Sequence, residues 1–301
     1  MPHSFFEVCD HISCDFFDFL TTIDATRARL SSSHFKDLIA GHQWDDIDTR
    51  IVGNFSWSTS RIGEKIRLWR LCFPQAISCN ISRQRGLVNS DFKLLQGIRM
   101  LDMSGCDQCG ITDQAFTYLK GIEWLNMSRC DQPGITDAAF EHLSGIHTLD
   151  MSGCNQPGIT DRAFEHLSGI HTLDISGCNQ PGITDDAFRN LSGIHTLDMS
   201  YCNQETITDD AFRNLTGIYF LNMSGCSQIT ITNHAFLYLR GIHTLNMEEC
   251  YQPTITNNII MYLGGIHTLN IRYCHQLTGP SFLTLGSINL IYESSIFLYD
   301  I

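Results

Sequence analysis

The residues with the greatest chemical potential in this chain are cysteines that recur every 24 residues. Eight of them form this series: Cys106, Cys130, Cys154, Cys178, Cys202, Cys226, Cys250 and Cys274. Because adjacent strands of a sheet lie about 4.8 Å apart, a row of thiols could oxidise or hold a soft metal ion. The series lacks the short C-x-x-C pairs that supply several ligands to one ion. We therefore predict buried, reduced, structural thiols without metal, and we assign no special role to Cys109, which lies outside the series.

Histidines recur with the same period, one per unit in most units. The row consists of His147, His171, His195, His243 and His267, and Tyr219 interrupts it. Stacked imidazoles could bind metal or respond to pH. Copying of one ancestral unit would produce the same row without a function, and we favour that interpretation. A glutamine two residues after each cysteine is likewise expected to be structural, because its amide can bond turn backbone.

The elements that carry these rows are similar units of 24 residues. Residues 145–168 read GIHTLDMSGCNQPGITDRAFEHLS, and the flanking units repeat the same apolar positions. Self-similarity at this period is typical of a stacked array, because one unit cannot bury its apolar face alone. The chain is therefore predicted to be mostly a solenoid.

Within each unit, the spacing of the apolar residues changes from that of a strand to that of a helix. Leu149 and Met151 alternate with polar residues, which predicts a short half-buried strand. Residues 155–158 are turn formers. Thr160 is a candidate helix N-cap, residues 163–167 carry one apolar helical face, and Gly169 is placed to close the helix in the left-handed conformation. We predict one strand and one short helix per coil.

This pattern resembles the leucine-rich repeat. The match is Ile146-x-x-Leu149-x-Met151-x-x-Cys154, and cysteine followed by Ile-Thr-Asp is similar to the cysteine-containing subclass. The resemblance implies an α/β horseshoe with parallel strands on the concave face and short helices on the convex face. Degenerate coils are expected from about Ile77 and, at the other end, in a last strand at residues 288–291.

The concave face would then present the outward side chains of the strands. Its middle is polar and acidic, and its ends carry aromatic and charged residues of the kinds that are over-represented among interface anchors. Drift in a duplicated array is the alternative explanation of this variation. The candidate contact residues are Met100, Trp124, Arg129, Asp150, Asp174, Asp198, Tyr201, Phe220, Glu248, Arg272 and Tyr273.

Charge indicates the class of partner. The formal net charge is −13, and acidic side chains outnumber basic ones by more than two to one between Gly97 and Gln276. Such a surface repels phosphate backbones and anionic lipids, so we expect a basic protein partner and no binding of nucleic acid or membrane. No secretory signal and no apolar run of roughly 20 residues is evident, which favours a cytoplasmic or nuclear location.

Catalysis is not expected. No glycine-rich phosphate loop, H-E-x-x-H or G-x-S-x-G motif occurs. The repeated Asp, His and Ser residues form a lattice at one coil spacing and do not converge on one point. We predict neither enzyme activity nor a cofactor.

The first residues lack the repeat and predict short apolar helices. These helices are expected within residues 16–30 and 35–39, with breaks near Thr21–Asp24 and Ser31–Ser33. The stretch 5–44 is similar to the F-box, a helical motif that docks on the Skp-family linker of cullin-RING ubiquitin ligases. Val8-Cys9 departs from the usual Leu-Pro of that motif. The linker-contacting residues that the resemblance implies are Phe16, Phe17, Leu20, Ile23 and Leu30.

Two functional interpretations follow from this domain order. The predicted parts are an F-box-like motif at 1–45, a connecting segment at 46–76 and a solenoid at 77–301, with eight complete units at 97–288. An F-box ahead of such repeats implies a substrate-recognition adaptor of an SCF-type ubiquitin ligase. Alternatively, the helices only cap the solenoid, and the protein is an interaction scaffold without a link to ubiquitin.

Overall fold

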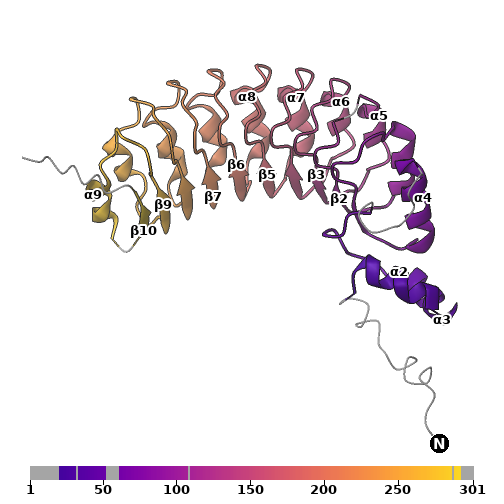
Figure 1. Cartoon of the computed structure of the whole chain (residues 1–301). Coiled ribbons are helices and arrows are strands. Elements are labelled where there is room, and N and C mark those ends of the chain that lie inside the picture. Colours follow the sequence, from indigo (N-terminus) through magenta and orange to yellow (C-terminus); the bar gives the residue numbers. More distant parts are fainter. Residues whose placement is uncertain (1–19, 32, 52–60, 108, 287, 293–301) are drawn as a thin grey trace, which may run out of the picture.

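The computed structural model describes residues 20–31, 33–51, 61–107, 109–286 and 288–292. Within these residues, ten short parallel strands form one sheet in which spatial order equals sequence order. Figure 1 shows the coils following one another along an arc, with the strands on its inner side and the helices on its outer side. The predicted horseshoe solenoid is therefore confirmed.

Every strand contains three residues and occupies the same place in its coil. The strands are β1 (Ser78–Asn80), β2 (Met100–Asp102), β3 (Trp124–Asn126), β4 (Thr148–Asp150), β5 (Thr172–Asp174), β6 (Thr196–Asp198), β7 (Phe220–Asn222), β8 (Thr244–Asn246), β9 (Thr268–Asn270) and β10 (Asn289–Ile291). The degenerate coils predicted at both ends are present, because β1 pairs with β2 and β10 pairs with β9.

Helices on the outer side are single turns, and only the N-terminal ones are longer. They are α2 (Thr22–Ser31), α3 (Ser33–Gly41), α4 (Ile62–Cys72), η2 (Asn89–Leu95), α5 (Asp113–Phe116), α6 (Asp137–Phe140), α7 (Asp161–Phe164), η3 (Glu165–Leu167), α8 (Asp185–Phe188), η4 (Arg189–Leu191), η5 (Ala211–Leu215), η6 (Ala235–Leu239), η7 (Asn257–Met261), α9 (Gly279–Phe282) and η8 (Leu283–Leu285). The η elements are 3-10 helices.

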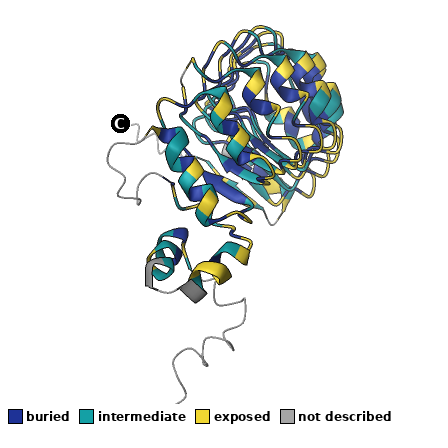
Figure 2. Cartoon of the chain, turned by 90° about the vertical axis from the view of Figure 1, so that its right-hand side faces the viewer, coloured by how far each residue is buried: buried dark blue, intermediate teal, exposed yellow. Residues whose placement is uncertain are grey.

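The local structure of one coil follows the predicted pattern. In β4 the side chain of Leu149 is buried between two half-buried neighbours. Thr160 caps α7 by accepting a hydrogen bond from the main-chain N–H of Arg162. Gly169 adopts φ +83°, a conformation that costs glycine little. Figure 2 shows the buried residues inside the stack and the exposed ones along the outer loops and helices.

Hydrogen bonds between coils explain why aspartate follows threonine in the repeat. The carboxylate of Asp161 accepts from the main-chain N–H of Thr184 at 2.7 Å and from its hydroxyl at 2.8 Å. Asp113, Asp137, Asp185 and Asp209 make the same paired contact with the next coil. Charge-assisted bonds of this kind are strong and directional, so each one fixes the register of two neighbouring coils.

The connecting segment contributes buried side chains to the first coil. Ile62, Ile66 and Trp69 of α4 are buried. The ring of Trp44 meets Phe73 edge to face at 5.3 Å between centroids, and the Trp44 carbonyl accepts from Ile77 N at the start of β1. These contacts join the N-terminal helices to the array through a packed segment.

One sequence-based prediction in this region is wrong. A break was expected near Thr21–Asp24, but α2 already begins at Thr22 and includes Ile23. The reason is local capping: the Thr21 hydroxyl accepts from the main-chain N–H of Asp24 and donates to its carboxylate. This reciprocal pair starts a helix where the apolar pattern indicated a turn.

Candidate protein interface

The first position of each strand from β2 to β9 contributes a row of half-buried side chains to the concave face. In register, Met100 pairs with Trp124, and both precede a run of threonines. Phe220 interrupts that run between Thr196 and Thr244. The structure thus brings Met100 and Trp124 together as one apolar pair and places Phe220 apart from them.

The last position of each strand forms a second row, and its acidic part is also structural. Asp150, Asp174 and Asp198 lie side by side in β4, β5 and β6. Each of the three accepts a hydrogen bond at Oδ1 from the main-chain N–H two residues later, at 2.8 to 2.9 Å. Burial, followed by the carboxylates on either side, raises the pKa of Asp174. These side chains cap the strand ends and still give the face a negative potential.

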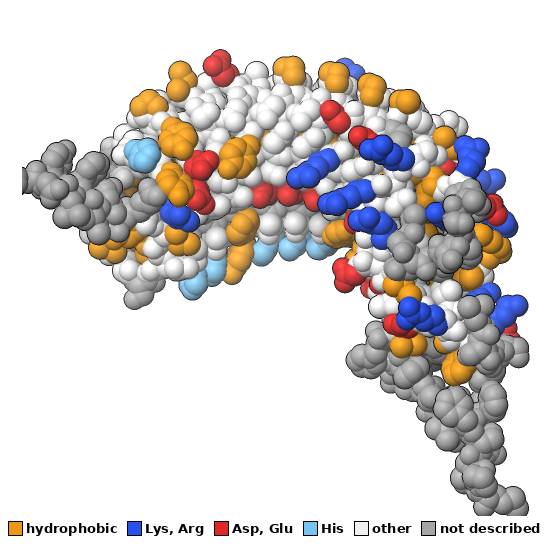
Figure 3. All heavy atoms as spheres, in the orientation of Figure 1, with side chains coloured by type: hydrophobic (Ala, Val, Ile, Leu, Met, Phe, Trp, Pro, Cys, Tyr) orange, Lys and Arg blue, Asp and Glu red, His pale blue; other side chains and the backbone are white. Residues whose placement is uncertain are grey.

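The histidines form a continuous aromatic stack along the inner edge of the arc (Figure 3). Adjacent rings lie 4.3 to 4.6 Å apart with interplanar angles of 11 to 15°, and Tyr219 takes the place of the missing imidazole. Each imidazole Nδ1 lies 3.0 to 3.1 Å from the hydroxyl of the next threonine. Burial and the neighbouring imidazoles lower the pKa of His171, which favours the neutral form of that ring.

A third row lies just after the strands and adopts the left-handed backbone conformation. Glycine occupies four of its positions with φ of +65 to +67°: Gly105, Gly153, Gly177 and Gly225. Larger residues occupy five positions with φ of +55 to +60°: Arg83, Arg129, Tyr201, Glu249 and Tyr273. A non-glycine residue in this region costs of order 1–3 kcal/mol, so these substitutions concentrate backbone strain on one row.

The large side chains of this row lie over the glycines of the next coil. A Cβ atom added at Gly153 would approach Arg129, and one added at Gly225 would overlap the ring of Tyr201. Passing over Gly225, the Tyr201 hydroxyl donates to the Glu249 carboxylate at 3.3 Å. Two coils that are not adjacent are therefore joined by an exposed contact.

Arg272 completes a cluster on the same C-terminal coils. Its guanidinium lies 5.0 Å from the ring centroid of Tyr273, donates to the Tyr273 hydroxyl at 3.1 Å and lies 3.9 Å from the Glu248 carboxylate. Figure 3 shows acidic and hydrophobic side chains meeting there, whereas Lys and Arg gather on the N-terminal coils. Sequence reasoning did not select Tyr251, although its place beside Cys250 interrupts a row of small polar residues.

The series of eight cysteines, called the cysteine ladder below, lies inside the array, away from this surface. Each of the eight thiols is buried and donates a hydrogen bond to a main-chain carbonyl of the preceding coil. Burial raises the pKa of Cys106 and of Cys274 to about 11, and it raises the pKa of the thiols between them further. Within the described residues no group of three potential metal ligands occurs. The predicted structural role of the ladder agrees with these contacts.

Thiol labelling is expected to separate the ladder from the surface cysteine. Alkylation of the native chain near neutral pH should modify the exposed Cys109 first and leave Cys154 and Cys178 unmodified, because buried thiols with a raised pKa form almost no thiolate. Peptide mass spectrometry with and without denaturant measures this difference. Labelling of Cys154 at the rate of Cys109 in the native chain would contradict the buried assignment.

The repeated glutamines bond turn backbone as predicted. Gln180, for example, donates from Nε2 to the carbonyl of Cys154 at 2.7 Å, and the glutamines of five other coils repeat the contact. These side chains tie the turns of neighbouring coils together and are not available to a partner.

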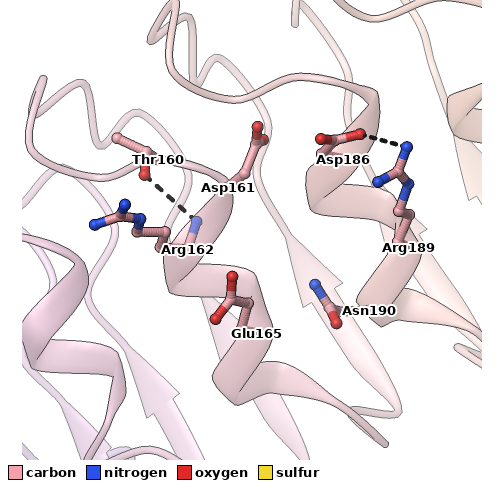
Figure 4. Close-up of a pocket in the computed structure, with 7 residues that line it drawn as sticks. All are labelled: Thr160, Asp161, Arg162, Glu165, Asp186, Arg189 and Asn190. Atoms are coloured by element: carbon pink, nitrogen blue, oxygen red, sulfur yellow. Dashed lines mark hydrogen bonds and ion pairs between the residues drawn. The ribbon is translucent and has the colours of Figure 1, made fainter.

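Pockets on the outer side have the period of the array. One of about 540 Å³ opens between α7 and α8, where Arg162 and Glu165 face Asp186 and Arg189 (Figure 4). A similar pocket of about 520 Å³ lies one coil further on. Both are open grooves with charged walls, and equivalent outer positions of successive coils line them.

The residues of the F-box-like stretch are only partly described. Phe16 and Phe17 lie outside the described residues. Leu20 and Ile23 are half-buried, and Leu30 lies in α2. No helix within the described residues combines the length and the apolar character needed to span a bilayer.

Comparison with solved structures identifies the class of fold. TLR13, in its complex with ssRNA13, superimposes with a TM-score of 0.58 at 19% identity over 74% of this chain and 33% of its own. A leucine-rich-repeat protein of Leptospira interrogans gives 0.57 at 13% identity over 71% and 53%. Toll, in its Drosophila complex with Spatzle, gives 0.52 at 11% identity over 74% and 37%.

These likenesses establish a leucine-rich-repeat solenoid and nothing finer. The matched region of this chain spans between a third and about half of the length of these three proteins. No family model matches it, and no curated protein does. The cysteine-containing subclass and the F-box therefore remain sequence-based proposals.

Proposed function

We propose that the chain is a protein-binding scaffold whose concave face and adjoining left-handed row form the interface. The observation that carries this proposal is the contrast between buried and outward positions. The buried leucine is the same in every strand from Leu101 to Leu269, whereas the outward neighbour changes among Met, Trp, Thr and Phe. Packing explains the uniform position, and recognition of a partner explains the varied one.

Strain supports the same proposal. Arg129, Tyr201 and Tyr273 keep large side chains where glycine would relieve the backbone. Strained residues persist when the surrounding structure holds them in place, and they cluster at binding sites. Arg129 and Tyr201 are exposed and Tyr273 is half-buried, and their guanidinium and aromatic groups suit anchoring contacts with a protein.

Site-specific photo-crosslinking in cells tests the scaffold function. A crosslinker at Thr172 in β5, on the inner face, is expected to capture a defined protein, whereas one at Glu165 in η3, on the outer face of a neighbouring coil, is not. The two positions share a similar distance from the chain ends, so expression and folding are matched. Capture from Glu165 alone, or from neither position, would exclude the concave face as the interface.

A narrower candidate is the adaptor of an SCF-type ubiquitin ligase. Its support is the sequence resemblance of residues 5–44 to the F-box, together with the position of α2 and α3, which project from the first coil and do not extend the stack (Figure 1). Under this proposal Leu20, Ile23 and Leu30 contact a Skp-family linker, and the array selects a target for ubiquitin transfer. The cysteine-containing repeat subclass is part of the same proposal.

Binding to a purified Skp-family linker decides between the two functions. The full chain should bind, and Ile23→Glu should abolish binding because it places a charge on the docking face of α2. Leu71→Glu is the matched control, since Leu71 is exposed on α4 outside the F-box-like stretch. Failure of the unmodified chain to bind removes the ligase function and leaves the scaffold function standing.

A further inference from the structure

We infer that the C-terminal coils carry a binding site for an arginine side chain, formed by Tyr201, Glu249 and Tyr251. This inference deepens the scaffold function proposed above, on which it rests, by naming the chemistry of the partner. The occupant is an arginine in an extended basic segment of a protein.

Geometry places the three residues around one exposed region. Tyr201 follows β6 and crosses Gly225 to reach the Glu249 carboxylate, which follows β8. The pKa of Tyr201 is raised chiefly by Glu249, with Glu248 and Tyr251 acting in the same direction. Burial and then Glu249 raise the pKa of Tyr251. Tyr251 lies two residues after Glu249, and its ring stacks on His275 of the next coil with the ring centroids 6.1 Å apart.

Within the described residues, the negative charge of Glu249 has no cationic partner. Tyr201 and Tyr251 are each 52% exposed, although the ring of Tyr201 lies against Gly225 and that of Tyr251 stacks on His275, so each ring is accessible in part. In the part of the chain that the structure describes, Glu249 forms no ion pair, and its side chain bonds only the Tyr201 hydroxyl. A carboxylate beside an exposed aromatic ring attracts a cation more strongly than either group alone.

The adjacent half of the cluster shows which cation fits. There Arg272 stacks on Tyr273, donates to its hydroxyl and faces Glu248. The chain thus satisfies one tyrosine–glutamate pair with its own guanidinium and leaves the neighbouring pair without one. A planar guanidinium can stack on a ring and bond a carboxylate at once, which a compact ammonium group does less well. Arginine is therefore preferred over lysine.

Backbone conformation distinguishes this site from accidental acidity. Glu249 and Tyr201 have φ of +59° and +56°. Glycine occupies the equivalent position after β4, β5 and β7, as Gly153, Gly177 and Gly225. Glycine at Glu249 would relieve the strain and remove the carboxylate together. If Glu249 binds a partner, its replacement by glycine should keep or raise the stability of the chain and weaken binding. If Glu249 is present only through drift, the replacement should leave binding unchanged.

Fluorescence anisotropy with a labelled Arg/Gly/Ser peptide tests the site in the full chain. Glu249→Gln should weaken binding about five- to tenfold, the loss expected for one charge-assisted contact of roughly 1 kcal/mol or slightly more. Glu205→Gln removes an exposed carboxylate of the Tyr201 coil outside the cluster and should change affinity less than twofold. A peptide with lysine in place of arginine should bind more weakly.

Glu249→Gly supplies the second measurement. Its Tm should equal or exceed that of the unmodified chain while peptide binding is lost to the same extent as in Glu249→Gln. Equal losses for Glu205→Gln and Glu249→Gln, no peptide binding, or a lysine peptide that binds as well would each overturn the inference. Crosslinking from Thr172 decides the scaffold function separately, so failure of the one is distinguishable from failure of the other.

Discussion

Replacing Phe188 with alanine is expected to lower the free energy of unfolding by about 3–5 kcal/mol, the range for removal of a fully buried aromatic ring. Most coils bury one phenylalanine at an equivalent position, and Ile260 takes that position in the coil that contains β8. The fully buried series is Phe92, Phe116, Phe140, Phe164, Phe188, Phe212, Phe236 and Phe282. Because each coil contacts only its neighbours, a cavity at Phe188 weakens both interfaces of one central coil.

Phe220 provides a control of the same residue type in the neighbouring region. It lies half-buried in β7 on the concave face, so Phe220→Ala should cost about 1 kcal/mol or less. Denaturant unfolding followed by circular dichroism measures both variants. Equal costs would show that the ring of Phe188 is not part of the core, and a cost for Phe220→Ala above that for Phe188→Ala would reverse the assignment of faces.

The buried periodicity made most of this fold predictable. Leu149, Met151 and Phe164 recur at fixed intervals because stacking forces equivalent buried positions into one register, and the strand, turn and helix follow from their spacing. The same reasoning located the two degenerate coils. It failed at Ile23, where side-chain capping by Thr21 decided the start of a helix that apolar spacing did not resolve.

The candidate interface was only partly predictable for a geometric reason. Tyr201 was a predicted contact residue, but its contact with Glu249 spans 48 residues and depends on a ring lying across Gly225. Left-handed strain likewise depends on backbone angles that residue types do not specify. The histidine row was visible by register, whereas ring stacking and the inclusion of Tyr219 required side-chain orientations.

Removal of one whole unit is expected to leave the fold intact, whereas removal of half a unit should destroy it. Deleting residues 169–192 joins Ser168 to Gly193 and creates a seam between two coils that carry the same buried residues. At that seam the Asp161 carboxylate would meet Thr208, which occupies the position of Thr184. The nearest-neighbour contacts are therefore all replaced by equivalents, and stability should fall only by the contribution of one repeat.

Deletion of residues 169–180 alone removes β5 and its turn but keeps α8, so the strand and helix registers no longer agree on either side. The Asp–Thr hydrogen bonds between coils and the series of buried phenylalanines would then be out of register, and buried hydrogen-bond donors would lose their acceptors. We expect a cooperative thermal transition and an unchanged circular-dichroism spectrum per residue for the first deletion, and loss of both for the second. Because the arginine site lies beyond the seam, the shorter solenoid should also retain peptide binding. Retained binding would show that the site depends only on its own coils. If both deletions unfold the chain to a similar extent, the array is not a sum of interchangeable repeats.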